Sequence, residues 1–113
     1  MSIKTERIGS NLVKEISYIL ATEIKDQDIK FVTITDCKVT NDLSFAKVYY
    51  TVFDQNRKKE TDAALKSASG YIRHLLHDRV DIRYIPELTF VYDESIEYGK
   101  KIEKKLEEIH EEK

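Results

Sequence analysis

The 113-residue sequence has no tryptophan, one proline, three glycines and one cysteine. A single cysteine, Cys37, excludes an internal disulfide and agrees with a reducing, cytoplasmic environment. With so little proline and glycine there is no evident linker, so we expect one domain over residues 1–113. No apolar run approaches the roughly 20 residues that cross a bilayer, and the N-terminus lacks a secretion signal. We therefore expect a cytoplasmic protein with no membrane partner.

Recognisable catalytic and cofactor motifs are also missing: there is no GxGxxG, no Walker lysine loop and no GxSxG elbow. Cys37 lies in a predicted strand beside Asp36 and Lys38, a setting that favours a structural thiol over a nucleophile. His74 and His77 share one side of a predicted helix, but two ligands do not define a metal site. We expect no enzyme, no cofactor, no metal and no small-molecule substrate.

Charge is plentiful but nearly balanced, with 35% charged residues and a net charge of −2. This balance argues against a protein that coats nucleic acid indiscriminately. The distribution is uneven, because residues 57–83 hold seven Lys/Arg against four Asp/Glu, whereas residues 93–113 hold five against eight. One end of the chain is therefore better suited to a polyanion than the other, although such runs are more often solvated surface.

Hydrophobic periodicity predicts a helix capped by Thr5 and running to about Lys25, with apolar residues three and four apart. β-Branched residues then predict strands over about 29–40 and 45–53. The short Asn41-Asp42 connection requires these two strands to pair antiparallel. A third strand is expected over 88–92, where Pro86 favours an edge or an end.

The stretch from Glu60 to Pro86 carries the most information. Its apolar residues have helical period, but Ser67-Ala68-Ser69-Gly70 interrupts the pattern with small residues, and a mid-helix glycine costs about 1 kcal/mol relative to alanine. We interpret the interruption as a kink that frees backbone N–H groups for an anion; an ordinary kinked helix with a solvated face is the alternative. The side opposite the core carries Lys59, Lys66, Gly70, Arg73, His74 and His77. A charged helix over about 94–113 completes the order helix, strand, strand, kinked helix, strand, helix.

Nearly the whole chain resembles the ribosome-binding factor A family of bacterial small-subunit assembly factors. No single string carries the resemblance; the order and spacing of several strings do. They are Arg7-Ile8, Val32-Thr33-Ile34-Thr35, Asn41-Asp42-Leu43, Ala46-Lys47-Val48-Tyr49-Tyr50, Ala68-Ser69-Gly70-Tyr71-Ile72-Arg73, Arg83-Tyr84-Ile85-Pro86-Glu87-Leu88-Thr89-Phe90 and Asp93-Glu94-Ser95.

The resemblance implies an α+β fold, a type II KH-like domain in which a small mixed three-stranded sheet is covered by helices and an Ala-x-Gly kink replaces the GxxG loop. It also implies a non-catalytic factor that binds the free 30S subunit, promotes late maturation and 5′-end processing of 16S rRNA, and matters in the cold. We expect a monomer. The candidate rRNA contacts on this basis are Lys59, Lys66, Ser69, Gly70, Arg73, His77 and Arg83.

Two other functions remain open. The chain could be a protein–protein interaction module without direct RNA binding, with an edge strand and the charged last helix as its contacts. A small enzyme is disfavoured, because no nucleophile–base pair or ligand set is evident. Each candidate contact could also be an ordinary solvated residue, or a structural one in the case of Gly70 and Arg83. Salt separates RNA from protein binding, since contacts to several phosphates weaken steeply as salt rises.

Overall fold

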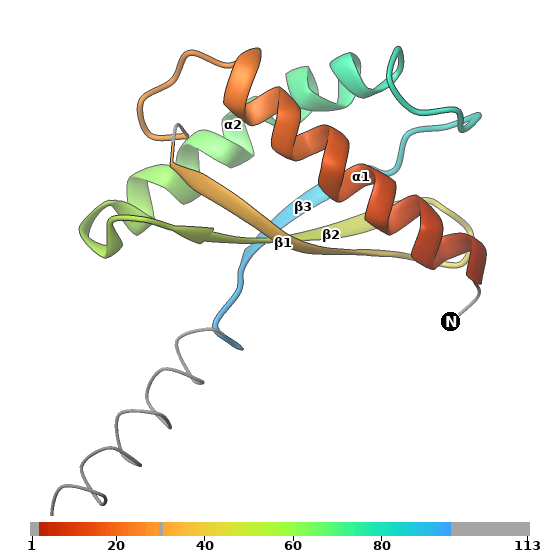
Figure 1. Ribbon diagram of the computed structural model, residues 1–113, viewed down its shortest axis with the longest axis horizontal. Helices are drawn as coiled ribbons and strands as arrows, with labels where there is room; N and C mark the ends of the chain where they lie inside the picture. The colour runs from red at the N-terminus through yellow and green to blue at the C-terminus, as the bar shows by residue number, and fades with distance from the viewer. Residues whose placement is uncertain (1–2, 30, 96–113) are drawn as a thin grey trace, which may run out of the picture.

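In the part of the chain that the structure describes, two helices lie on one side of a three-stranded sheet (Figure 1). The computed structural model describes residues 3–29 and 31–95. The elements are α1 (Ile3–Thr22), β1 (Val32–Val39), β2 (Phe45–Val52), a 3₁₀ turn (Gln55–Arg57), α2 (Lys58–Leu76) and β3 (Glu87–Tyr92). β2 is the central strand, antiparallel to β1 and parallel to β3. The predicted α+β fold with a mixed sheet is therefore confirmed.

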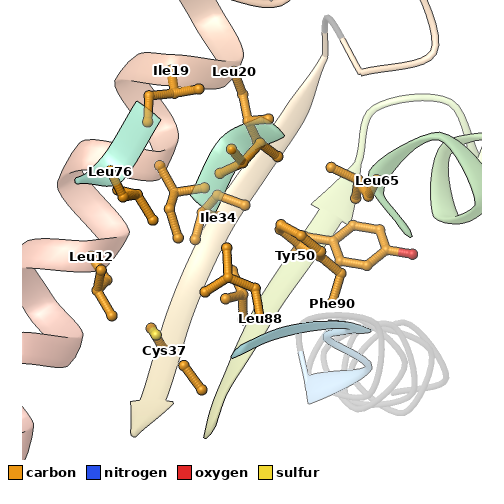
Figure 2. Close-up of a cluster of buried hydrophobic side chains, with 14 of the residues drawn as sticks. Leu12, Ile19, Leu20, Ile34, Cys37, Tyr50, Leu65, Leu76, Leu88 and Phe90 are labelled. Carbon is orange, nitrogen blue, oxygen red and sulfur yellow. The ribbon is translucent and has the colours of Figure 1, made fainter. Parts of the chain in front are cut away.

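The core fills the space between the helices and the sheet (Figure 2). Leu12, Ile16 and Ile19 of α1 are fully buried there, as the helical period predicts. The strands contribute alternate residues, because successive side chains point to opposite faces, except in β1, where a register shift between Ile34 and Asp36 interrupts the alternation. On β2 these are Ala46, Val48 and Tyr50, and their neighbours in the sequence face away from the helices.

The hairpin between β1 and β2 turns without a glycine. Leu43 N–H donates to the Thr40 carbonyl oxygen at 2.9 Å, and Leu43 itself has a φ of 63°. The Asp42 carboxylate accepts hydrogen bonds from the Ser44 N–H and the Thr40 hydroxyl. A bulky residue in the left-handed region is unusual, so the side-chain bonds of Asp42 help to hold Leu43 in a conformation that leucine does not favour.

Three boundary predictions are wrong. Thr5 is not an N-cap, because α1 already begins at Ile3 and Thr5 is buried in its first turn. The same helix ends at Thr22 rather than near Lys25, and β1 begins at Val32, three residues after the predicted start. Ends of elements depend on tertiary packing, which periodicity does not encode.

The predicted interruption of α2 is also wrong. The helix runs unbroken from Lys58 to Leu76, through Ser69 and Gly70. Neither residue leaves the helical conformation, and Gly70 has a negative φ. The physical reason is that one glycine in a helix otherwise rich in good helix formers lowers stability without breaking the hydrogen-bond ladder. From residue 96 onward, the predicted last helix lies outside the described residues.

Candidate nucleic-acid interface

One side of α2 faces away from the sheet and carries most of the predicted contacts. We call Lys59, Lys66, Gly70, Arg73 and His77 the outer side of α2, and all five are exposed. Lys59 and His77 are 18 residues apart, which separates them by about 27 Å along the helix. The predicted residues thus line an elongated surface rather than a pocket. Because α2 is unbroken, it offers no freed N–H groups, and the anion site predicted at a kink is absent from this helix.

Gly70 lies at the middle of the outer side and is open to solvent. A Cβ atom built on it meets nothing within 4 Å among the described residues. Gly70 is therefore not there to allow close packing within this part of the chain. Ser69, which is half-buried, donates its hydroxyl to the Lys66 carbonyl oxygen at 2.9 Å. Its hydroxyl is thus already used within the helix.

Arg73 has a structural partner that the sequence did not reveal. Its Nε and one terminal nitrogen donate to the carbonyl oxygen of Ile85, at 3.1 Å and 2.8 Å. Ile85 is buried, so this pair of bonds ties α2 to the segment that leads into β3. Two of the five guanidinium N–H groups are used in this way. Arg73 is therefore an anchored cation, held in a fixed position on the outer side of α2.

Lys66 belongs to a chain of polar contacts that reaches into the core. Its ammonium group lies 2.8 Å from the Asp62 carboxylate, and the Tyr50 hydroxyl donates to the other oxygen of Asp62 at 2.7 Å. The Lys66 hydrogen bond, helped by Tyr50, lowers the pKa of Asp62 below its ordinary value. The positive charge of Lys66 is thus partly compensated before any ligand arrives.

Arg83 is brought to the same end of the molecule as Arg73. It lies two residues before Ile85 in sequence, and its guanidinium carbon is 5.5 Å from the centre of the exposed Tyr84 ring. Lys59 lies at the opposite end of α2. The structure therefore gathers Lys66, Ser69, Gly70 and Arg73 within two helical turns, with His77 and Arg83 beyond them and Lys59 apart.

Chemistry other than binding finds no support in the described residues. Cys37 is buried, and desolvation, with a smaller effect of Asp36, raises the pKa of its thiol to about 12. The thiol therefore stays protonated at neutral pH, as expected of a structural cysteine. Within residues 3–29 and 31–95, no three His, Cys, Asp or Glu side chains lie close enough to hold a metal ion. The same ranges contain no helix long and apolar enough to span a membrane.

A second exposed surface went unnoticed at the level of sequence. The face of the sheet opposite the helices carries Phe45, Lys47 and Tyr49 of β2, with Lys38 of β1 alongside. The alternation of β2 was the available signal. It predicts that at least one of Tyr49 and Tyr50 points inward, and Tyr50 is the buried one.

Comparison with known proteins agrees with this architecture. The family model of ribosome-binding factor A matches residues 4–106. The chain is 48% identical to ribosome-binding factor A of Staphylococcus epidermidis over 110 residues, which cover 96% of this chain and 95% of the relative. It is 47% identical to that of Caldanaerobacter subterraneus over 112 residues, or 97% and 92% of the two chains.

Solved structures share the fold at low identity. A putative ribosome binding factor A from Thermotoga maritima, solved by NMR, has a TM-score of 0.71 at 22% identity over 84% of this chain and 92% of its own. The crystal structure of the Thermus thermophilus protein has a TM-score of 0.68 at 24% identity, over 78% of this chain and 94% of the Thermus chain. A homology model of the Thermus protein, fitted into a cryo-EM map of a 30S–RbfA complex, has a TM-score of 0.62 at 21% identity. The match covers 84% of this chain and 97% of the homology model.

Proposed function

The chain belongs to the ribosome-binding factor A family, and we propose that it contacts rRNA through the outer side of α2. Membership of this family makes it a non-catalytic, 30S-binding maturation factor involved in 16S rRNA processing. The 30S subunit is cytoplasmic, so this function places the chain in the cytoplasm. We further propose that it acts late in maturation, on the 5′ end of 16S rRNA, and that the need for it is greatest in the cold.

Gly70 is the observation that carries the proposed contact. A glycine in the middle of a helix costs about 1 kcal/mol relative to alanine, and no contact within the described residues requires it. Glycine is also the residue that allows a ligand to approach the backbone most closely. We infer that the ligand is a sugar–phosphate backbone lying across Gly70.

The flanking charges support an anionic ligand. Lys66 is one turn before Gly70 and Arg73 nearly one turn after it, both exposed. The bonds to Ile85 hold Arg73 in place, so little side-chain entropy is lost when a phosphate binds it. On this proposal Lys66 exchanges part of its contact with Asp62 for a phosphate oxygen.

Sedimentation with purified 30S subunits across a salt series tests this assignment. Gly70→Gln raises helix propensity and places a long side chain on the surface, so it should weaken 30S binding while the protein stays folded. Ala21→Gln is the matched control, because Ala21 is also exposed but lies on α1. Equal binding by both variants and the wild-type protein would remove the outer side of α2 from the interface.

Charge provides the second arm of the test. Lys66→Glu should weaken 30S binding and make it less dependent on salt. Each phosphate contact contributes about one to the slope of log affinity against log salt concentration. Lys14→Glu makes the same charge change on an exposed position of α1 and should have a much smaller effect. Arg73→Glu is a poor probe, because it also breaks the bonds to Ile85. Binding that is insensitive to salt would favour a protein–protein contact instead.

A further inference from the structure

None of the helices in residues 3–29 and 31–95 covers one face of the sheet, and the central strand carries a regular pattern of side chains there. Phe45, Lys47 and Tyr49 alternate with the buried residues of β2 and so share this face. Lys38 of β1 and Thr89 of β3 are the direct neighbours of Lys47 in the sheet. We call these five residues the open sheet face. It lies opposite the helices (Figure 1) and therefore opposite the outer side of α2.

The two lysines form an unfavourable pair. Lys38 and Lys47 are directly opposite each other on antiparallel strands, and both are exposed. Like charges at such positions destabilise a sheet. Within the described ranges, neither lysine lies within 4.0 Å of a carboxylate. A phosphate group between the two ammonium groups would turn this repulsion into attraction.

Aromatic rings flank the lysines along β2. Phe45 is 53% exposed and Tyr49 is half-buried, and their separation of four residues is about 13 Å in a strand. The Lys38 ammonium lies 5.8 Å from the centre of the Tyr49 ring. Accessible rings on a sheet face that no described helix covers are the arrangement on which unpaired RNA bases stack in sheet-based RNA-binding domains.

Acidic residues limit the positive region. Asp36 pairs with Tyr49 in the sheet and Glu87 with Phe45, and both are exposed on this face. General attraction to a polyanion is therefore weak here. Binding must come from a phosphate placed between Lys38 and Lys47 and from bases stacked on the rings, which favours single-stranded RNA over a duplex.

We propose that the open sheet face is a second rRNA contact, which takes an unpaired segment with its bases stacked on Phe45 and Tyr49 and a phosphate between Lys38 and Lys47. The proposal rests on the function proposed above. With the outer side of α2 on the opposite side of the domain, the protein would lie between two rRNA segments and fix their relative position during maturation.

The lysine pair allows a test in which stability and binding move in opposite directions. Lys38→Gln removes the repulsion, so its urea unfolding midpoint should equal or exceed that of the wild-type protein. Its affinity for 30S subunits should fall about fivefold to tenfold. The slope of log affinity against log salt concentration should be smaller in magnitude by about one. Lys14→Gln on α1 is the matched control and should leave affinity within twofold. A Lys38→Gln variant with wild-type affinity would overturn the proposal.

Phe45 tests the stacking component. Phe45→Thr keeps a strand-forming residue but removes the ring, and should weaken 30S binding about fivefold or more. Phe45→Tyr keeps a ring and should restore binding. If the threonine and tyrosine variants bind equally well, stacking at this position is excluded.

Crosslinking identifies the partner and separates the two proposals. Photoreactive groups at Thr89 and, in a second sample, at Ser67 on α2 should both crosslink to 16S rRNA in the 30S complex. Crosslinks from Thr89 to a ribosomal protein would overturn the RNA contact on the sheet. If wild-type protein fails to bind 30S subunits at all, the proposed function fails first; if it binds and only α2 variants weaken it, the sheet proposal alone fails.

Discussion

Gly9 of α1 and Gly70 of α2 both lie in the interior of a helix but have opposite surroundings. A Cβ atom built on Gly9 would lie 2.5 Å from the carbonyl oxygen of Cys37, whereas one built on Gly70 meets no atom of the described residues within 4 Å. The first glycine lets a helix backbone approach the backbone of β1. For Gly70, no close backbone approach within the described residues explains the presence of glycine. Glycine alone therefore does not distinguish packing from binding; the atoms around it do.

The largest effect is expected from Gly9→Ala. The added methyl group would overlap a backbone carbonyl of the sheet, which cannot rotate away as a side chain can. Overpacking of this kind costs up to about 3 kcal/mol in the free energy of unfolding, far more than the gain in helix propensity. Urea unfolding followed by circular dichroism measures the loss.

Cys37 offers an independent readout of the same substitution. Its thiol is buried with a raised pKa, so alkylation at pH 8 should be slow in the wild-type protein and faster in Gly9→Ala. A Gly9→Ala protein with wild-type stability and wild-type labelling would show that α1 does not need to lie this close to β1.

Arg73 does not fit a simple division into packing and binding residues. It lies on the exposed outer side of α2, yet its hydrogen bonds link α2 to the segment before β3. Arg73→Ala removes two hydrogen bonds from the carbonyl oxygen of buried Ile85. We expect a loss of about 1.5 kcal/mol, a usual value for bonds from a charged donor. Arg83→Ala, at an exposed neighbouring arginine, should change stability by less than about 0.5 kcal/mol. Equal stability of the two variants would make Arg73 a surface residue with no anchoring role.

Much of the fold could be predicted from sequence, for reasons that these residues make clear. The β-branched run from Val32 and the alternation of β2 place both strands to within a few residues, because local pattern and sheet burial agree there. The closeness of Gly9 to Cys37 could not be predicted, since it depends on how a helix packs on a strand 28 residues away. The bonds from Arg73 to Ile85 likewise depend on the path of a loop.

The candidate site was predicted less well than the fold. The helical wheel correctly places Lys59, Lys66, Gly70, Arg73 and His77 on an exposed side. The kink was inferred from the cost of Gly70, but a cost in helix propensity indicates only that some benefit exists, not that the helix breaks. Whether these residues contact rRNA stays a prediction, because burial and hydrogen bonding within one chain do not report on a partner.

Gly70→Ala should have the opposite sign from Gly9→Ala. The new methyl group would meet no atom of residues 3–29 or 31–95 within 4 Å, and alanine is the better helix former by about 1 kcal/mol. The variant should therefore unfold at higher urea concentration than the wild-type protein. A loss of stability would show that Gly70 has a structural role in the fold, and the argument for a ligand at this position would lose its basis.

The smallest effect is expected at Lys66. Its contact with Asp62 is exposed and has the i, i+4 spacing, so Lys66→Ala should cost only about 0.3–0.5 kcal/mol near neutral pH. The pKa of Asp62 is lowered in the folded state from an ordinary value of 3.8, chiefly by Lys66. The stabilisation is thus fully present above that value and is lost as pH falls through the lowered pKa. Wild-type and variant unfolding curves should begin to approach each other as pH falls below 3.8 and should coincide below the lowered pKa of Asp62. A difference that persists in acid would mean that Lys66 acts through the packing of its aliphatic chain rather than through its charge.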